Sequence, residues 1–350
     1  MNFALIGHQD SWEKIIRFTD FFSHGKSKAS LEKVKEIYSY IPPRKLFDID
    51  VESITGQSIT GCYIETFISP DDLVFGYWKK NVEKVKDAAD CARSSGAGIA
   101  ALGGFTSIVL EGTDNSLNEN SATKFTTGNS LTAAFIVKSI EKACKLMNKE
   151  INKQQVLIIG ATGDIGSACV QYFAGKVKKL LLCARQVISL QGLSENLNNR
   201  NYPAVASMDV NALLPEADII IAIANSIIEN FNSSLCKKDV IICDAGYPKN
   251  LLENLDTGLA DRLFFGGMGM VNGKYSCHPD IGHQLYDFPF QKIAHGCLLE
   301  AVVLSLGNMY IPYSTGKGNI NPEKIEEIYS LANKHGITEA PFFNTHGAWD

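Results

Sequence analysis

The sequence of 350 residues has no apolar run that approaches the roughly 18 residues of a membrane-spanning helix. Its first residues also lack the basic, then apolar, then small-residue order of a signal peptide. Hydrophobic residues nevertheless make up 45% of the chain and charged residues 20%, which is typical of soluble globular proteins. We therefore expect a cytoplasmic protein, without a membrane span, that is long enough for two domains with a real core.

The chain has no excess of positive charge. The 33 lysine and arginine residues are outnumbered by 38 acidic residues, and the net charge of -5 argues against general binding of polyanions. We expect no nucleic-acid partner. One basic segment, with Lys79, Lys80, Lys84 and Lys86, is most simply a solvated helix face, although it also suits docking of an acidic carrier protein.

The nine cysteines form no C-x-x-C pair, and the chain is too large to need disulfide bonds for stability. They are therefore expected to be reduced thiols, with no disulfide framework and no metal site. The sequence also shows no internal repeat and no low-complexity segment.

A strand, a glycine turn and a helix follow one another in the middle of the chain. The apolar run 156–159 leads into the turn 160–166, a helix follows from Ser167, and a second apolar run covers 180–184. Glycines at such a turn let a pyrophosphate approach the backbone N–H groups at a helix N-terminus, although a plain turn is the alternative. The predicted cofactor contacts are Gly160, Thr162, Gly163, Asp164, Ile165 and Gly166.

The residues after the second run indicate which dinucleotide binds. An acidic residue there would hold the ribose 2′-hydroxyl of NAD, but this chain has Ala184 followed by Arg185, and a guanidinium suits a 2′-phosphate. We therefore predict NADPH as the cofactor. The alternative is that Arg185 is a solvated surface cation.

Three further apolar runs end in small or polar residues. The runs 218–224 and 239–244 are followed by Asn225 and by Ala245-Gly246, and the run 262–267 closes on Gly266-Gly267. Ligands of open α/β sheets lie beyond the carboxyl ends of the strands, so Asn225 and Gly246 are predicted to face the nicotinamide, and Gly267 is a further predicted cofactor contact.

The predicted fold class is α/β: a Rossmann-like, doubly wound parallel sheet, preceded by a smaller α/β domain and followed by C-terminal helices that pack back on it. The predicted divisions are an N-terminal α/β substrate domain (1–150), an NADP-binding domain (151–288) and a C-terminal helical segment (289–350). Pro289 is expected to start a helix that runs through Cys297 to Leu306.

Two segments of the first domain are candidates for substrate contacts. Gly104 and Phe105 follow an apolar run, and Thr127 and Asn129 lie in a hydroxyl-rich stretch before a helix. Their backbone N–H groups could approach a ligand. A tight left-handed corner and helix capping explain the two segments equally well.

Several strings resemble, in order, the aldehyde-forming long-chain acyl-[acyl-carrier-protein] reductases known from cyanobacteria, up to about residue 337. The strings are LIGH at 5–8, SITG at 53–56, ALGGF at 101–105, FTTGN at 125–129, GATGDIGS at 160–167 and GYPKN at 246–250. The resemblance implies an NADPH-dependent enzyme that takes an acyl group from a carrier thioester onto a cysteine and releases an aldehyde. By position, the nucleophile is Cys297. The chain departs from the family pattern at 268–286, 295–296 and 338–350, which leaves open the acyl chain length and whether acyl carrier protein or coenzyme A carries it.

From the residues alone, Cys297 is one of nine cysteines, and a free cysteine usually behaves as a small core hydrophobe. Burial would raise the pKa of its thiol and make it less reactive, so a nucleophilic Cys297 needs a cation, a helix terminus or a base nearby. On the expected helix, His295 would face away from Cys297 and could not serve as that base. This argument does not apply to His278 and His283. Two rival functions stay open: direct hydride transfer by an NADP-dependent dehydrogenase or ketoreductase, and a non-enzymatic NADP-binding sensor.

Overall fold

The computed structural model describes residues 1–23, 30–73, 78–111, 116–224, 228, 230–247, 249, 251, 255, 257–281 and 288–349. The chain forms two compact units. The first unit contains Met1–Gly128, Met270–Gly316 and Ser330–Thr338, and the second contains Asn129–Gly269, Lys317–Tyr329 and Glu339–Asp350.

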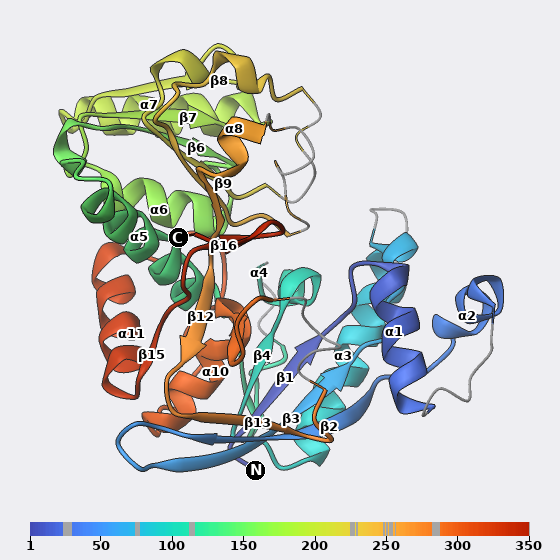
Figure 1. The fold of residues 1–350 in the computed structure, drawn as a ribbon. Coiled ribbons are helices and arrows are strands. Elements are labelled where there is room, and N and C mark those ends of the chain that lie inside the picture. Colours follow the sequence, from blue (N-terminus) through green and yellow to red (C-terminus); the bar gives the residue numbers. More distant parts are fainter. Residues whose placement is uncertain are drawn as a thin grey trace. The chain divides into compact units, whose positions relative to one another are not determined.

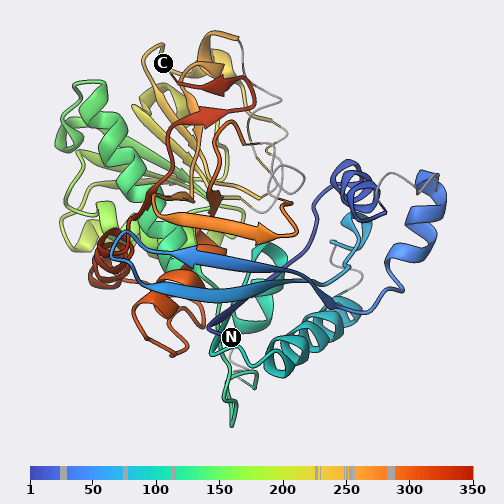
Figure 2. The ribbon, with the colours of Figure 1, turned by 60° about the horizontal axis from the view of Figure 1, so that its bottom comes forward.

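The first unit contains a six-stranded sheet with the order β13-β2-β3-β1-β4-β5 (Figure 1). Its strands are β1 (Phe3–Gly7), β2 (Arg44–Glu52), β3 (Ser58–Glu65), β4 (Ile99–Leu102), β5 (Lys124–Thr126) and β13 (Lys274–His278). Strands β3, β1, β4 and β5 are parallel, so their carboxyl ends lie at one edge of the sheet. The other two strands are antiparallel: β2 forms a hairpin with β3, and β13 pairs with β2 (Figure 2).

Five helices of this unit lie within the described residues. They are α1 (Trp12–Phe22), α2 (Leu31–Tyr38), α3 (Trp78–Ser94), α4 (Ile108–Glu111) and α10 (Gly296–Leu306). Ser11 and Ser30 cap α1 and α2, because each hydroxyl accepts a backbone N–H three residues on. Alanines and aliphatic residues of α3 pack on β1, β3 and β4 in one core, and α10 also packs on β1, β3 and β4 (Figure 1).

The second unit contains a six-stranded, all-parallel sheet with the order β11-β10-β9-β6-β7-β8. Its strands are β6 (Gln155–Ile159), β7 (Lys179–Cys183), β8 (Ala204–Ser207), β9 (Ile219–Ala222), β10 (Ile241–Asp244) and β11 (Leu263–Phe265). Numbered from β6, this is the 3-2-1-4-5-6 order of a Rossmann fold, in which ligands bind where the order reverses. That point lies between β6 and β9. The predicted fold class is thereby confirmed.

The helices of the second unit are α5 (Asn129–Leu146), α6 (Asp164–Phe173), α7 (Val187–Asn199) and α8 (Thr257–Ala260). Helices α5 and α6 lie side by side (Figure 1). The sheet has a continuous aliphatic core, because strands buried on both faces need apolar residues at successive positions. Near the C-terminus β16 (Phe343–Asn344) pairs with β17 (Gly347–Ala348), and β16 packs beside β11.

The remaining elements are short or include the points where the chain changes unit. A three-stranded sheet has the order β14-β12-β15, with β14 at Ile293–His295, β12 at Met268–Val271 and β15 at Ile337–Glu339. Helix α11 covers Pro322–Lys334, with a proline at its first position. Five 3-10 turns complete the described elements: Pro70–Asp72, Gly104–Ser107, Ile151–Lys153, Leu214–Glu216 and Ser233–Leu235.

The compact units do not follow the predicted divisions at residues 150 and 288. The chain changes unit first at Gly128, because α5 packs along α6 and not in the core of the first sheet. It changes again at Gly269, because β13 completes the first sheet through antiparallel pairing with β2. Sequence pattern placed α5 with the elements that precede it, whereas tertiary packing places it with those that follow.

Candidate active site

The predicted glycine turn joins β6 to α6. Gly160 has φ +90°, and a Cβ built on it would lie 2.5 Å from the carbonyl oxygen of Ile223. Gly163 is the N-cap of α6, and a Cβ on Gly166 would lie 2.1 Å from the Gly160 carbonyl oxygen. Each glycine therefore keeps the backbone close-packed at the start of a helix, which is the arrangement a pyrophosphate needs. Thr162 and Ile165 are partly exposed within this turn.

The other predicted cofactor contacts lie at the carboxyl ends of neighbouring strands. Ala184 and Arg185 follow β7, with Arg185 exposed to solvent, as a contact to a 2′-phosphate requires. Gly246 follows β10, where its N–H donates to Asp244 Oδ1 at 3.1 Å, and Gly267 follows β11 with φ +72°. Asn225 lies outside the described residues.

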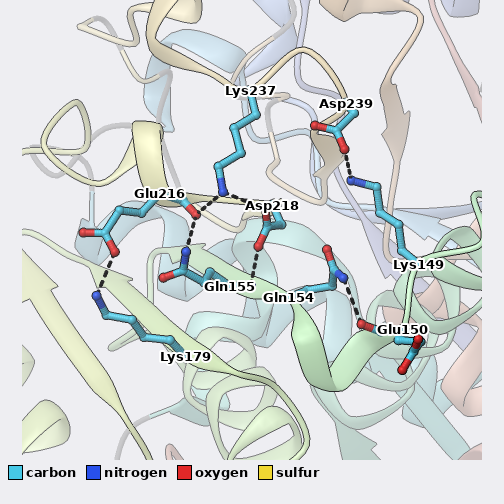
Figure 3. Close-up of polar contacts among 9 residues, drawn as sticks. All are labelled: Lys149, Glu150, Gln154, Gln155, Lys179, Glu216, Asp218, Lys237 and Asp239. Carbon is cyan, nitrogen blue, oxygen red and sulfur yellow. Dashed lines mark hydrogen bonds and ion pairs between the residues drawn. The ribbon is translucent and has the colours of Figure 1, made fainter.

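The opposite edge of the same sheet is occupied by ion pairs (Figure 3). Lys149 lies 2.6 Å from Asp239, Lys237 lies 2.6 Å from Asp218, and Lys179 lies 2.8 Å from Glu216. Asp218 also accepts the backbone N–H of Gln155 at 2.7 Å. These charges are paired with one another at the amino ends of the strands, so the edge with the glycines is the better candidate for a ligand.

Asp164 and Asn129, which were predicted to contact cofactor and substrate respectively, contact each other. Asn129 donates its side-chain N–H to Asp164 Oδ2 at 2.8 Å, and the backbone N–H of Gly318 donates to Asp164 Oδ1 at 2.8 Å. Both side chains are buried. The carboxylate therefore ties the start of α5 and the segment before α11 to the first turn of α6, where the helix dipole favours a negative charge.

Cys297 lies in the first turn of α10, which corrects the prediction for this segment. The expected helix from Pro289 does not form: β14 (Ile293–His295) occupies that stretch, and the helix starts at Gly296 with His295 as its N-cap residue. The strand forms because residue 293 onward pairs in the small sheet with β12. His295 is therefore outside the helix, and the helical argument that turned it away from Cys297 was wrong.

Backbone N–H groups surround the Cys297 thiol. Burial raises its pKa above the ordinary value, while hydrogen bonds from the backbone of Gly104, Leu298 and Cys297 itself act to lower the pKa. Burial also raises the pKa of the other eight thiols, and among the described residues no backbone donor acts on any of them. A helix N-terminus is one of the environments that makes a cysteine nucleophilic, and it distinguishes Cys297 from the rest.

Two glycine turns enclose the start of α10. A Cβ on Gly103 would lie 2.7 Å from the Leu298 side chain, and a Cβ on Gly128 would lie 2.0 Å from the carbonyl oxygen of Cys297 and 2.3 Å from its Cα. Gly128 has φ +72°. Gly128 therefore needs glycine, because a side chain there would displace the backbone that carries the thiol, whereas a Cβ on Gly103 would displace the end of the Leu298 side chain.

Glu300 is completely buried one turn after Cys297. It accepts hydrogen bonds from the hydroxyls of Thr126 and of Ser314, the latter at 3.0 Å. The Ser314 carbonyl oxygen in turn accepts the Thr127 N–H at 2.8 Å. This network holds the residues after β5 against α10, so the Glu300 carboxylate has a structural role. Its charge acts to raise the pKa of the Cys297 thiol.

Sequence reasoning missed three polar residues at the carboxyl ends of β1 and β3. His8, Gln9 and Glu65 are all buried, and Gln9 donates to Glu65 Oε2 at 2.9 Å. Burial raises the pKa of Glu65 to about 7. The available sequence signal was the polar pair His8-Gln9, which directly follows the first apolar run. Because β1 is parallel to β4, this pair lies at the edge of the sheet where Gly103 and Gly104 also lie.

Phe105 and Thr127, two predicted substrate contacts, are placed at this same edge. The N–H of Phe105 donates to His8 Nε2 at 3.0 Å, and the two rings meet edge-on with centroids 6.4 Å apart. Thr127 is buried. Gly104, Phe105, Thr127 and Cys297 thus converge within one unit, and their contacts with a substrate remain a prediction.

Comparison with known proteins is consistent with this arrangement. The chain is 31% identical to the long-chain acyl-[acyl-carrier-protein] reductase of Synechococcus elongatus, over 96% of this chain and 98% of that protein. This chain belongs to the long-chain acyl-[acyl-carrier-protein] reductase family. The resemblance seen in the sequence is therefore confirmed, and the chain is an oxidoreductase.

Residues 141–260 of this reductase-family chain also match the model of the shikimate / quinate 5-dehydrogenase family. The aminotransferase PigE of a Serratia species is 25% identical over 70% of this chain, which corresponds to 28% of PigE. Among solved structures, L-tryptophan dehydrogenase from Nostoc punctiforme aligns over 94% of this chain and 79% of its own, with 11% identity and a TM-score of 0.39.

In the described part of the chain, no helix is long and apolar enough to cross a membrane. No group of three or more histidine, cysteine, aspartate or glutamate side chains within those residues is arranged to hold a metal ion.

Proposed function

We propose that this protein reduces a fatty acyl thioester to a fatty aldehyde with NADPH, through an acyl group held on Cys297. The observation that carries the proposal is the position of this cysteine in the first turn of α10, where backbone N–H groups act on its thiol. Membership of the acyl-[acyl-carrier-protein] reductase family supports the substrate class.

In the first half-reaction the Cys297 thiolate attacks the carbonyl carbon of the thioester. A new carbon–sulfur bond forms and the bond to the carrier sulfur breaks, and the carrier leaves as a thiolate that takes up the proton lost by Cys297 on ionisation. The N–H groups of Gly104 and Leu298 are the donors that the oxyanion would meet. Such donors are usually worth a factor of about 10² to 10³ in rate.

In the second half-reaction the carbonyl carbon of the acyl group on Cys297 is reduced, the bond to Cys297 breaks and the aldehyde leaves. NADPH, when bound, supplies the hydride for this step. The residues of this chain fit that cofactor: the glycines of the β6–α6 turn leave no room for a Cβ, and Arg185 is exposed beyond β7. Arg185 would hold the 2′-phosphate, and the first turn of α6 would hold the pyrophosphate.

The carrier of the acyl group is acyl carrier protein in this proposal, with coenzyme A as the alternative. The name of the Synechococcus elongatus relative favours the former. The exposed lysines of α3 suit an acidic carrier, although Lys80 already pairs with Asp72 at 3.3 Å. An assay in which acyl carrier protein and coenzyme A, each carrying the same acyl group, compete for the enzyme distinguishes the two carriers.

Intact-mass measurement tests the covalent step. The protein is mixed with a long-chain acyl thioester in the absence of NADPH, and the expected result is a mass increase of one acyl group that disappears, with release of aldehyde, when NADPH is added. Cys297→Ser should abolish the adduct and the aldehyde but retain NADPH binding. Cys236→Ser is the matched control, because Cys236 is also partly exposed and burial raises its thiol pKa to about 11.

The two rival functions predict different results. A direct hydride-transfer enzyme would form product without any adduct, and a non-enzymatic NADP-binding sensor would form neither. A folded Cys297→Ser protein that still carries the acyl group would exclude Cys297 as the nucleophile.

A further inference from the structure

We propose that His8 is a positioning residue that holds the backbone N–H of Gly104 toward the reacting group on Cys297. The expected effect of His8 on acyl transfer rests on the proposed function, because it assumes that Cys297 carries an acyl group. Its effect on the thiol itself does not depend on that assumption.

The hydrogen bonds of His8 define its tautomer. Its Nε2 accepts the N–H of Phe105 at 3.0 Å, so this nitrogen carries no hydrogen. Its Nδ1 lies 3.2 Å from the carbonyl oxygen of Gln9, which accepts a hydrogen bond from it. The ring is therefore a neutral imidazole that bridges the end of β1 and the turn after β4.

That turn presents two successive backbone donors. Gly104 has φ +59°, and the turn is anchored on both sides, by Gly103 N–H donating to Ile6 O at 2.8 Å and by the Thr106 hydroxyl donating to Gly103 O at 2.9 Å. His8 accepts the Phe105 N–H, and the preceding backbone group, that of Gly104, acts to lower the pKa of the Cys297 thiol. Holding one peptide plane in a turn of this kind orients its neighbour.

His8 is poorly suited to act as a general base. Its Nε2 lone pair is already occupied by the Phe105 N–H, and burial lowers the pKa of the ring. Among the groups that face it, Asp10 acts to raise the pKa, and Lys14, which pairs with Asp10 at 2.7 Å, acts to lower it. The ring therefore serves as a fixed acceptor.

The test compares His8→Gln with His8→Asn and His8→Leu. A glutamine amide can place its oxygen near the position of Nε2 and accept the Phe105 N–H, whereas the shorter asparagine amide reaches only the region of Nδ1, and leucine has no acceptor. His335→Leu is the control for loss of a buried histidine, because His335 is 2% exposed and bonds to Ser53.

The first measurement is the rate at which iodoacetamide alkylates Cys297 as a function of pH, followed on the Cys297 peptide by mass spectrometry. His8→Leu and His8→Asn should raise the apparent pKa of the thiol by about one unit, since one hydrogen bond to a charged group corresponds to a shift of that order. His8→Gln and His335→Leu should leave it unchanged. The second measurement is acyl-enzyme formation, which should fall about tenfold or more in the first two variants and be largely restored in His8→Gln.

An unchanged thiol pKa in folded His8→Leu or His8→Asn would overturn the proposal. If His8→Leu does not fold, the comparison of His8→Asn with His8→Gln still decides, and equal behaviour of those two variants would also overturn it. Failure of the wild-type protein to form an acyl-enzyme would refute the proposed function instead, while the alkylation measurement would still report on His8.

Discussion

Gly128→Ala should disable Cys297 without unfolding the protein. A Cβ at this position would lie 2.0 Å from the Cys297 carbonyl oxygen and 2.3 Å from its Cα, whereas real Cβ contacts are longer than about 3 Å. Relief of the collision requires movement of the backbone at the start of α10 by about 1 Å. Misplacement of a reacting group by that distance can cost about 10² in rate.

The matched control is Gly96→Ala. Gly96 has φ +70° and Gly128 has φ +72°, so both variants bear the same cost of a left-handed alanine, about 1 to 2 kcal/mol. No described atom lies within 4 Å of a Cβ at Gly96, so the two variants differ only in the collision with Cys297.

Thermal melting and the rate of acyl-enzyme formation separate the two effects. Gly96→Ala should lower stability slightly and form the adduct at the wild-type rate, whereas Gly128→Ala should lose about 10² in that rate. If Gly128→Ala is as stable as Gly96→Ala and forms the adduct at the wild-type rate, the close packing of Gly128 on Cys297 has no functional consequence and the reasoning is refuted.

Two further predictions concern the cofactor and pH. Arg185→Ala should weaken NADPH binding by about 1.5 to 3 kcal/mol and leave NADH binding unaffected, because only NADPH has the 2′-phosphate. Fluorescence titration of both cofactors checks this, with Arg200→Ala as the control. Equal weakening of NADPH and NADH binding would contradict the prediction. Burial raises the folded-state pKa of Glu65 to about 7 from an ordinary 4.5, so the neutral acid adds stability below pH 4.5 that is lost as the pH rises through 7, about 3 kcal/mol in all. Glu65→Gln should therefore reduce the decrease in the free energy of unfolding between roughly pH 5 and 7, as measured by denaturant titrations. If the variant shows the same decrease as the wild type, Glu65 is not its cause.

The cofactor half of the fold could be predicted from local pattern. The turn at 160–166 is defined within one strand, one turn and one helix, and its glycines are required by contacts among residues a few positions apart, such as Gly166 with Gly160. Parallel strands also read as uninterrupted apolar runs, so β6, β7, β9 and β10 were each visible in the sequence. The serine caps of α1 and α2 are equally local.

The surroundings of Cys297 depend on tertiary structure. A cysteine has no pattern that distinguishes a core residue from a nucleophile, and here the difference comes from β14, whose pairing with β12 ends the extended segment at His295 and puts Cys297 at a helix start. The donors that act on the thiol come from the turn after β4 and from α10, nearly 200 residues apart in the chain, and the acceptor on the Phe105 N–H is the residue that follows β1. Only parallel pairing of these strands brings their carboxyl ends to one edge, so no window of the sequence contains the site.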